Sequence, residues 1–423
     1  MSVPRDCFAA VTPGFEDVTE REVHALGVTQ VVAVPGGVAF RADDAGLVRA
    51  NLRLRTASRV LVRAASFTAK SFAELERRTK RVRWAAYVAS GARIALRVTC
   101  RKSRLYHSDA VAERLAKWIT AAVPGVEVAR VRGHDSDDSD AAAAGAVATE
   151  VGPPQLFVVR FDRDVCTISA DSSGDLLHRR GYRLATAKAP MRETLAAGIL
   201  FALGYDGTMP LLDPMCGAGT IAIEAALIAR NIAPGIHRSF ACETWPGFDR
   251  AAAARERAAA RAGERPPAGT TKDDRGQHLH LPHAPIMASD RDAGAIEAAV
   301  ANAERAGVAP DIVLARRALS AIEPMPGPGL VLTNPPYGAR VGERAALRSL
   351  YAQLGNVARA KLPGWRVALV SAERSLDAQT RLPLEVVATF SNGGIPVRLM
   401  ATPPPGPSAG AAATRRARPL VRS

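Results

Sequence analysis

The second half of the chain alternates short apolar strands with helical stretches, and this alternation constrains the fold more than any other feature. From about residue 186 the sequence predicts strands at residues 210–213, 286–290, 330–333 and 366–371. Such alternation is typical of a parallel sheet with helices on its faces. The final strands, 385–391 and 395–402, flank the turn Asn392-Gly-Gly394 and read as an antiparallel hairpin. We therefore expect an α/β domain over residues 186–403, with a mostly parallel, seven-stranded sheet that ends in a hairpin.

The first 172 residues predict a different, α+β organisation in two parts. Residues 1–62 read as a small unit of strands and helices, and residues 63–172 repeat the alternation in a second unit. Within the second unit a helix is expected over residues 110–122, with Ser108 or Asp109 as its N-cap.

Three segments have a biased composition. Residues 133–154 are rich in Asp, Ser, Ala and Gly and are interpreted as an insertion. Residues 250–285 are interpreted as a helix followed by a second, disordered insert. Residues 404–423 form a low-complexity basic tail containing Arg415, Arg416 and Arg418, which we interpret as solvated.

Composition narrows the class of protein. The 423 residues are 48% hydrophobic and carry a formal net charge of +15, which favours a polyanion as partner, although an arginine-rich genome would give the same bias. The sequence contains no apolar run of membrane-spanning length and no signal peptide pattern, so a cytoplasmic location is expected. Its five cysteines lack the spacing of metal sites, so no metal is expected.

A glycine-rich turn follows the strand at 210–213. Asp213 ends that strand, and Gly217 and Gly219 open the next helix, where missing β-carbons let a ligand approach the backbone. The G-x-G spacing is shorter than the G-x-G-x-x-G of dinucleotide-binding proteins. Asp213, Cys216, Gly217 and Gly219 are therefore candidate cofactor-binding residues, with close helix packing as the alternative role of the glycines.

The neighbouring strand also ends in an acid. Asp290 stands at the end of the strand at 286–290, where a carboxylate can accept hydrogen bonds from ribose hydroxyls. Asp292 is close by, and one of the two is expected to cap the following helix. Asp290 is favoured for the ribose because it lies at the strand end.

The string Asn334-Pro-Pro-Tyr337 follows the apolar strand at 330–333. Its prolines fix an extended backbone, so the Asn334 side chain and the Pro335 carbonyl can accept both hydrogens of an aromatic amine. Tyr337 offers a ring on which the base can stack. With the glycine turn, this string predicts methyl transfer from S-adenosylmethionine to an exocyclic amine, achieved mainly by positioning.

Six stretches together resemble a known family. The chain resembles the bacterial THUMP-domain guanine-2-amino methyltransferases of large-subunit (23S) ribosomal RNA. The resemblance is carried by residues 171–175, 178–183, 190–197, 212–220, 232–237 and 334–338.

This resemblance implies a fold, a cofactor and a substrate. It implies a ferredoxin-like subdomain at 1–62, a THUMP RNA-binding domain at 63–172, and a Rossmann-like methyltransferase domain that uses S-adenosylmethionine. It further implies that Glu193 and Thr194 help to hold the methionine end of the cofactor. Some family members carry a fused 7-methylguanosine domain, which is expected to be absent here because the sequence stops at Ser423.

A basic cluster in the first half is a candidate RNA contact. Arg97, Arg101, Lys102 and Arg104 lie on and after one predicted strand, where they could hold phosphates. A solvated turn explains the cluster equally well, and the arginine-rich face at 77–83 is the alternative contact.

Other functions remain open at this point. A THUMP-type transfer RNA guanine-2-amino methyltransferase and a DNA adenine methyltransferase share the predicted chemistry, and a glutamine methyltransferase shares the Asn-Pro-Pro-Tyr string. A non-catalytic RNA-binding assembly factor is the alternative from another class. Retention of Gly217, Gly219 and Asn334 favours an enzyme. The expected partner is ribosomal RNA or a pre-ribosomal particle, with no obligatory protein partner.

Overall fold

The structure is a computed structural model that describes residues 3–129, 153–183, 191–267, 283–325, 327–337 and 344–404. Most of the expected insertion at 133–154, residues 268–282 of the second insert and the tail after residue 404 lie outside these ranges. By contacts the chain divides into two units. The first comprises Met1–Arg183, Met191–Gly198 and Asn231–Arg265, and the second comprises Ile199–Arg230 and the described residues from Pro266 onwards.

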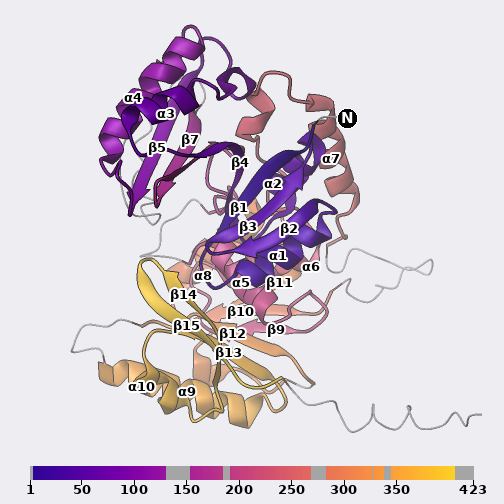
Figure 1. The fold of residues 1–423 in the computed structure, drawn as a ribbon. Helices are drawn as coiled ribbons and strands as arrows, with labels where there is room; N and C mark the ends of the chain where they lie inside the picture. The colour runs from indigo at the N-terminus through magenta and orange to yellow at the C-terminus, as the bar shows by residue number, and fades with distance from the viewer. Residues whose placement is uncertain are drawn as a thin grey trace, which may run out of the picture. The chain divides into compact units, whose positions relative to one another are not determined.

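The first unit is built on one eight-stranded sheet in the order β2-β3-β1-β4-β8-β7-β5-β6 (Figure 1). Its strands are β1 (Arg5–Val11), β2 (Thr29–Val34), β3 (Gly37–Ala42), β4 (Ala57–Thr68), β5 (Arg93–Arg101), β6 (Glu127–Val128), β7 (Gln155–Asp162) and β8 (Val165–Asp171). All pairings are antiparallel except those of β5 with β6 and β7.

The long strand β4 joins the two halves of this sheet. It has 12 residues, and β1 pairs with its first part while β8 pairs with the rest. Val62, for example, lies opposite Cys7 of β1, and Thr68 lies opposite Val165 of β8. The boundary expected after residue 62 therefore falls inside a continuous strand. Sequence periodicity did not reveal this, because one strand can satisfy two neighbours in succession.

The helices of the first unit are α1 (Glu16–Ala25), α2 (Asp44–Arg53), α3 (Phe72–Thr79), α4 (Ser108–Ala122) and α7 (Arg250–Ala262). The expected N-cap of α4 is wrong. The cap position is His107, which makes no side-chain cap hydrogen bond, and Ser108 is already the first helical residue. In contrast, α2 has a conventional cap, because Asp43 accepts a hydrogen bond of 2.8 Å from the Gly46 backbone N–H.

Helix α7 belongs to the first unit although its sequence lies within the span 186–403. It packs against α2, and the Arg49 guanidinium forms an ion pair of 2.6 Å with Glu256. Both side chains are largely covered, so this pair is better shielded from water than an exposed one. The helix is thus held by the ferredoxin-like end of the chain.

The second unit contains a seven-stranded sheet in the order β11-β10-β9-β12-β13-β15-β14 (Figure 1). Its strands are β9 (Leu211–Asp213), β10 (Ile286–Asp290), β11 (Ile312–Arg316), β12 (Leu330–Thr333), β13 (Arg366–Ser371), β14 (Glu385–Asn392) and β15 (Ile395–Ala401). The first five are parallel, and β15 pairs antiparallel with both β13 and β14. The predicted parallel sheet with a terminal antiparallel hairpin is confirmed.

Apolar side chains of the parallel strands meet helices to form the core of this unit. The helices are α6 (Thr220–Ala229), α8 (Ala293–Arg305), α9 (Arg344–Lys361) and α10 (Arg374–Asp377), while α5 (Glu193–Ala202) begins in the first unit and ends in the second. Leu212, Val331 and Leu369 from the strands pack with Tyr351 and Leu354 of α9. Burial of these residues fixes the sheet from which the strand ends project. None of the helices within the described ranges combines the length and apolar character that a membrane crossing requires.

Candidate active site

The carboxyl ends of three neighbouring strands bring the predicted residues to one edge of the sheet. Strand β9 lies between β10 and β12 and pairs in parallel with both, with Asp213 opposite Ala288. Asp213 and Asp290 are the last residues of β9 and β10, and Asn334 follows β12 directly. In open α/β sheets, ligands bind outside this edge of the strands. The motifs predicted from the sequence are therefore neighbours in space.

The two glycines of the turn have different reasons to be glycine. Both have positive φ, +51° at Gly217 and +82° at Gly219. A β-carbon built at Gly217 would meet no atom within 4 Å, so this backbone faces open space. A β-carbon at Gly219 would lie 3.0 Å from the Ala299 Cβ. Gly217 thus suits ligand approach, and Gly219 permits close packing of the turn against α8.

Hydrogen bonds to neighbouring backbone fix the shape of this turn. The Cys216 N–H donates to the Ser289 carbonyl across 3.0 Å, and the Gly219 N–H donates to the Cys216 carbonyl across 2.9 Å. The Cys216 side chain is buried, and burial raises the pKa of its thiol. Cys216 therefore contributes a rigid backbone and an uncharged side chain.

The structure separates the roles of the two neighbouring acids. Asp290 accepts hydrogen bonds from the Gly217 N–H at 3.1 Å and from the Asp292 N–H at 3.0 Å. The Asp292 carboxylate instead caps α8 by accepting the Ala295 N–H at 3.0 Å. Asp290 is therefore the acid that faces the glycine turn. Its carboxylate is partly exposed, so each oxygen keeps acceptor capacity for a ligand hydroxyl.

Asp213 is an unusual carboxyl because it is fully buried. Burial raises its pKa to about 7, the charge of Asp290 adds to this rise, and the Thr333 hydroxyl and Met215 N–H oppose it. The Met215 N–H donates to the Asp213 carboxyl across 3.2 Å. The site thus combines one buried carboxyl whose pKa is raised with a second, more exposed one, that of Asp290.

Asn334 presents a buried acceptor. Its Oδ1 is covered from solvent and accepts no hydrogen bond from any residue in the described ranges. Such an atom costs free energy unless something supplies a donor, so a ligand amine is its natural partner. Pro335 beside it is buried, and Tyr337 is half-buried. Tyr337 accepts a hydrogen bond of 2.6 Å from the Asn392 amide, and burial raises its pKa.

Sequence reasoning missed two polar residues of this edge. Asn392 was assigned only to the hairpin turn, yet its side chain contacts Tyr337. Ser289 was read only as a strand residue, yet its hydroxyl is buried and has no hydrogen-bond partner among the described residues. No local pattern could have identified either, because each role depends on which strands become neighbours.

Glu193 and Thr194 lie in the first turn of α5, and both are buried. The Glu193 carboxylate forms an ion pair of 3.2 Å with Arg183. By contacts these residues group with the first unit rather than with the glycine turn. Their part in holding the methionine end of the cofactor stays a prediction.

The basic cluster of the first unit lies at the end of β5. Arg101, Lys102 and Arg104 are exposed and Arg97 is half-buried. The Asp164 carboxylate accepts the Arg104 backbone N–H at 2.7 Å, so an acid lies within the cluster. Its role in RNA binding also stays a prediction.

Within the described ranges, no group of three or more His, Cys, Asp or Glu residues is arranged to hold a metal ion.

Two family models match the chain. The model described as the RMKL-like methyltransferase domain covers residues 180–397, and that of the RlmL ferredoxin-like domain covers residues 6–61. The chain belongs to the RMKL-like methyltransferase family. The predicted ferredoxin-like start and methyltransferase fold are thereby confirmed, and so is S-adenosylmethionine as the cofactor.

Two curated relatives resemble this chain over 94% of its length. A Synechocystis protein named "Putative RNA methyltransferase slr0064" is 32% identical over 94% of this chain and 96% of its own length. "Ribosomal RNA large subunit methyltransferase K/L" of Methylococcus capsulatus is 32% identical over 94% of this chain, but over 51% of its own length. The chain therefore spans about half of the K/L relative.

Solved structures show the same RMKL-like architecture. The structure of "a possible methylase from Clostridium difficile 630" is 30% identical and covers 96% of this chain and 99% of its own, with a TM-score of 0.80. The structure of SMU.472, described as "a putative methyltransferase complexed with SAH", has a TM-score of 0.79. It is 24% identical and covers 96% of this chain and all of its own, which shows the shared fold.

The residues at the sheet edge fit S-adenosylmethionine. The open face of Gly217 leaves the backbone accessible to a ligand, and Asp290 beside it keeps acceptor capacity for ribose hydroxyls. Asn334, on the other side of β9, offers the unpaired acceptor that a methyl-accepting amine needs. The residues predicted for the cofactor and for the substrate therefore stand at the ends of three neighbouring strands of one sheet.

Proposed function

We propose that this protein methylates the exocyclic 2-amino group of a guanine in large-subunit (23S) ribosomal RNA. The observation that carries the proposal is the buried Asn334 oxygen without a donor, next to the strand that bears the glycine turn. The name of the Methylococcus relative supports ribosomal RNA as the substrate. The net charge of +15 supports a polyanionic partner.

The chemistry would follow from positioning. S-adenosylmethionine, when bound, supplies an electrophilic methyl group. Asn334 Oδ1 and the Pro335 carbonyl would accept the two hydrogens of the amine, which directs the nitrogen lone pair away from the base. Tyr337 would hold the base by stacking. Holding both reactants in this geometry lowers the barrier without a covalent enzyme intermediate.

The assignments of the remaining parts belong to the same proposal. We place a THUMP domain at residues 63–172, where β5, β7 and β8 are joined to the ferredoxin-like strands. Asp290 would accept the ribose hydroxyls of the cofactor, and Glu193 and Thr194 would contact its methionine end. Asp213, Cys216 and Gly219 would shape the turn on which Gly217 meets the cofactor.

Two measurements test this function. Calorimetry should detect binding of S-adenosylmethionine by the purified protein, and absence of binding would favour the non-catalytic assembly factor. N2-methylguanosine should then be mapped in ribosomal and transfer RNA from cells that lack the gene. Loss of one N2-methylguanosine from large-subunit ribosomal RNA is expected. Loss from transfer RNA alone would favour the transfer RNA alternative.

A further inference from the structure

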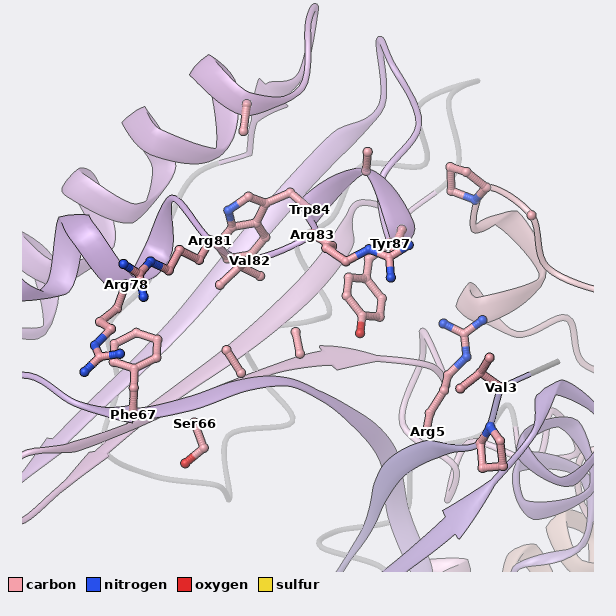
Figure 2. Close-up of a pocket in the computed structure, with 18 of the residues that line it drawn as sticks. Val3, Arg5, Ser66, Phe67, Arg78, Arg81, Val82, Arg83, Trp84 and Tyr87 are labelled. Atoms are coloured by element: carbon pink, nitrogen blue, oxygen red, sulfur yellow. The ribbon is translucent and has the colours of Figure 1, made fainter.

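An open pocket lies in the first unit, and none of the residues assigned to methyl transfer lines it. Its volume is about 1060 Å³, and it is lined by β4, the C-terminal end of α3, the turn η1 (Trp84–Ala86) and the start of the chain at β1 (Figure 2). This volume is at the upper end of the range of about 300–1,000 Å³ for small-molecule sites. The pocket is therefore large enough for part of a polymer.

Arginines dominate the charge of this pocket. Arg78, Arg81 and Arg83 line it, and within the described ranges their side chains form no hydrogen bond or ion pair. Arg5 also lines it but is neutralised by Asp44 at 2.9 Å. Three guanidinium groups are thus available to an anion. The mutual repulsion of these arginines raises the free energy of the folded protein, and a bound polyanion would relieve that repulsion.

The segment that carries these arginines is held in place. Along it, exposed and buried residues alternate: Arg81 and Arg83 are exposed, whereas Val82 and Trp84 are buried. The Trp84 indole N–H donates to the Thr79 carbonyl across 3.2 Å, and its ring meets Phe157 edge to face at 5.1 Å. The anchored residues therefore fix the backbone that carries the arginines along the pocket.

Aromatic rings accompany the charges. Phe67 and Tyr87 line the pocket and are both half-buried. Tyr87 is fixed by edge-to-face contacts with Trp245 at 5.1 Å and Phe157 at 6.4 Å. Figure 2 shows Arg78 and Arg81 toward the Phe67 end of the pocket and Arg83 toward Tyr87. Rings interleaved with cationic groups are the arrangement that binds single-stranded nucleic acid, because bases stack while phosphates are neutralised.

We propose that this pocket binds an unpaired strand of the RNA substrate, with its phosphates on Arg78, Arg81 and Arg83 and a base against Tyr87. The inference rests on RNA being the substrate, and it adds a contact separate from the Asn334 site. A concave pocket with aromatic walls admits splayed bases, whereas the stacked bases of a helix cannot reach its rings. An unpaired segment of the RNA is therefore the ligand.

The pocket is a better RNA site than the exposed turn that includes Arg101, Lys102 and Arg104. That turn contains Asp164, whose carboxylate accepts the Arg104 N–H, and Arg101 lies opposite Asp162 in the sheet. These acids offset part of its positive charge. Among the residues that line the pocket, Asp44 is the one acid, and it is already paired with Arg5. The pocket and the turn thus each carry three cationic side chains, but nearby acids offset more of the positive charge at the turn.

This difference supplies a matched control. The pocket variant carries Arg78→Gln, Arg81→Gln and Arg83→Gln, and the control carries Arg101→Gln, Lys102→Gln and Arg104→Gln. Each loses three positive charges from exposed positions of the same unit. The full chain is titrated with a single strand of about 12 uridines, within the range of about 4–16 nucleotides bound by single-strand sites. A duplex of equal length is titrated in parallel, and thermal unfolding verifies the fold.

The pocket variant should bind the single strand about tenfold more weakly or worse. Its slope of log affinity against log salt should fall by about 2, because three phosphate contacts each contribute about 0.7. The control variant should lose less affinity and less salt slope than the pocket variant, because Asp162 and Asp164 already offset part of the charge of its turn. An unchanged pocket variant, equal losses in both variants, or a duplex that binds as tightly through the same arginines would each overturn the proposal.

The assay is independent of methyl transfer. It contains no cofactor and no guanine, so it reports on the pocket even if the proposed reaction is wrong. Suppose that single-strand binding depends on the pocket, but that the protein does not methylate ribosomal RNA. This result would refute the proposed function and would still support the pocket as an RNA-binding site. Crosslinks from 4-thiouridine in the same strand should map to the segment from Phe67 to Tyr87. Crosslinks confined to the turn that includes Arg101 would contradict the pocket.

Discussion

The side-chain amide of Asn392 donates a hydrogen bond to the phenolic oxygen of Tyr337 across 2.6 Å, although 55 residues separate them. Asn392 ends β14 at the tip of the terminal hairpin, where it pairs with Ile395. The hairpin therefore holds the ring that we propose to stack on the target base. Asn392 acts as a positioning residue, since it reaches the base only through Tyr337.

Asn392→Ala should lower kcat for methyl transfer by about fivefold, the equivalent of a hydrogen bond worth about 1 kcal/mol. Tyr337→Phe keeps the ring and removes the same bond, so it should show a similar loss. In the double variant the losses should not add. Additive losses would show that Asn392 acts by another route. Unchanged cofactor affinity in all three variants is the control.

Asp290→Asn should weaken binding of S-adenosylmethionine, by about 1–3 kcal/mol for a lost charged hydrogen bond. Asp292→Ala is the matched control, because that carboxylate caps α8. It should lower the free energy of unfolding by about 1 kcal/mol and leave cofactor affinity unchanged. Calorimetry and thermal unfolding measure the two effects. If Asp292→Ala weakens cofactor binding and Asp290→Asn does not, Asp292 is the residue that binds the ribose.

Substitutions at the two turn glycines should separate ligand access from packing. Gly217→Val should weaken cofactor binding, since its side chain would enter the open space beside the turn. Gly219→Ala should instead lower stability, because its methyl group would lie 3.0 Å from the Ala299 Cβ. Equal cofactor affinity in parent and folded Gly217→Val would remove Gly217 from the cofactor site.

Much of the second unit follows from local sequence pattern. The apolar strands and the Asn392-Gly-Gly394 turn predicted the parallel sheet and its hairpin, because period and turn chemistry are local. The meeting of Asp213, Asp290 and Asn334 followed from the common direction of parallel strands. These predictions needed no knowledge of packing.

Features that depend on tertiary neighbours could not be predicted. The Asn392–Tyr337 bond and the contact that Gly219 needs with Ala299 each join distant segments. The sharing of β4 between β1 and β8 depends on two pairings of one strand. The cap of α4 was predicted one or two residues late, because Ser108 and Asp109 have cap chemistry but the helix begins at Ser108.

The buried carboxyl of Asp213 should make stability depend on pH. Its pKa is raised from 3.8 to about 7 in the folded protein, so the unfolded chain loses this proton first. Stability from this group is complete below about pH 4 and is lost as the pH rises through about 7. Asp213→Asn should therefore gain stability relative to the parent between these values. A difference in melting temperature that stays constant with pH would contradict the raised pKa.

The most direct measurement is methyl transfer by Asn334→Ala to guanine in unmethylated large-subunit ribosomal RNA. The Asn334 oxygen has no partner in the described protein, so its removal should not reduce stability or S-adenosylmethionine affinity. Formation of N2-methylguanosine should fall by about 100-fold or more, as for loss of one positioned polar group in an active site. Parent-like methylation by a folded Asn334→Ala protein would contradict the account.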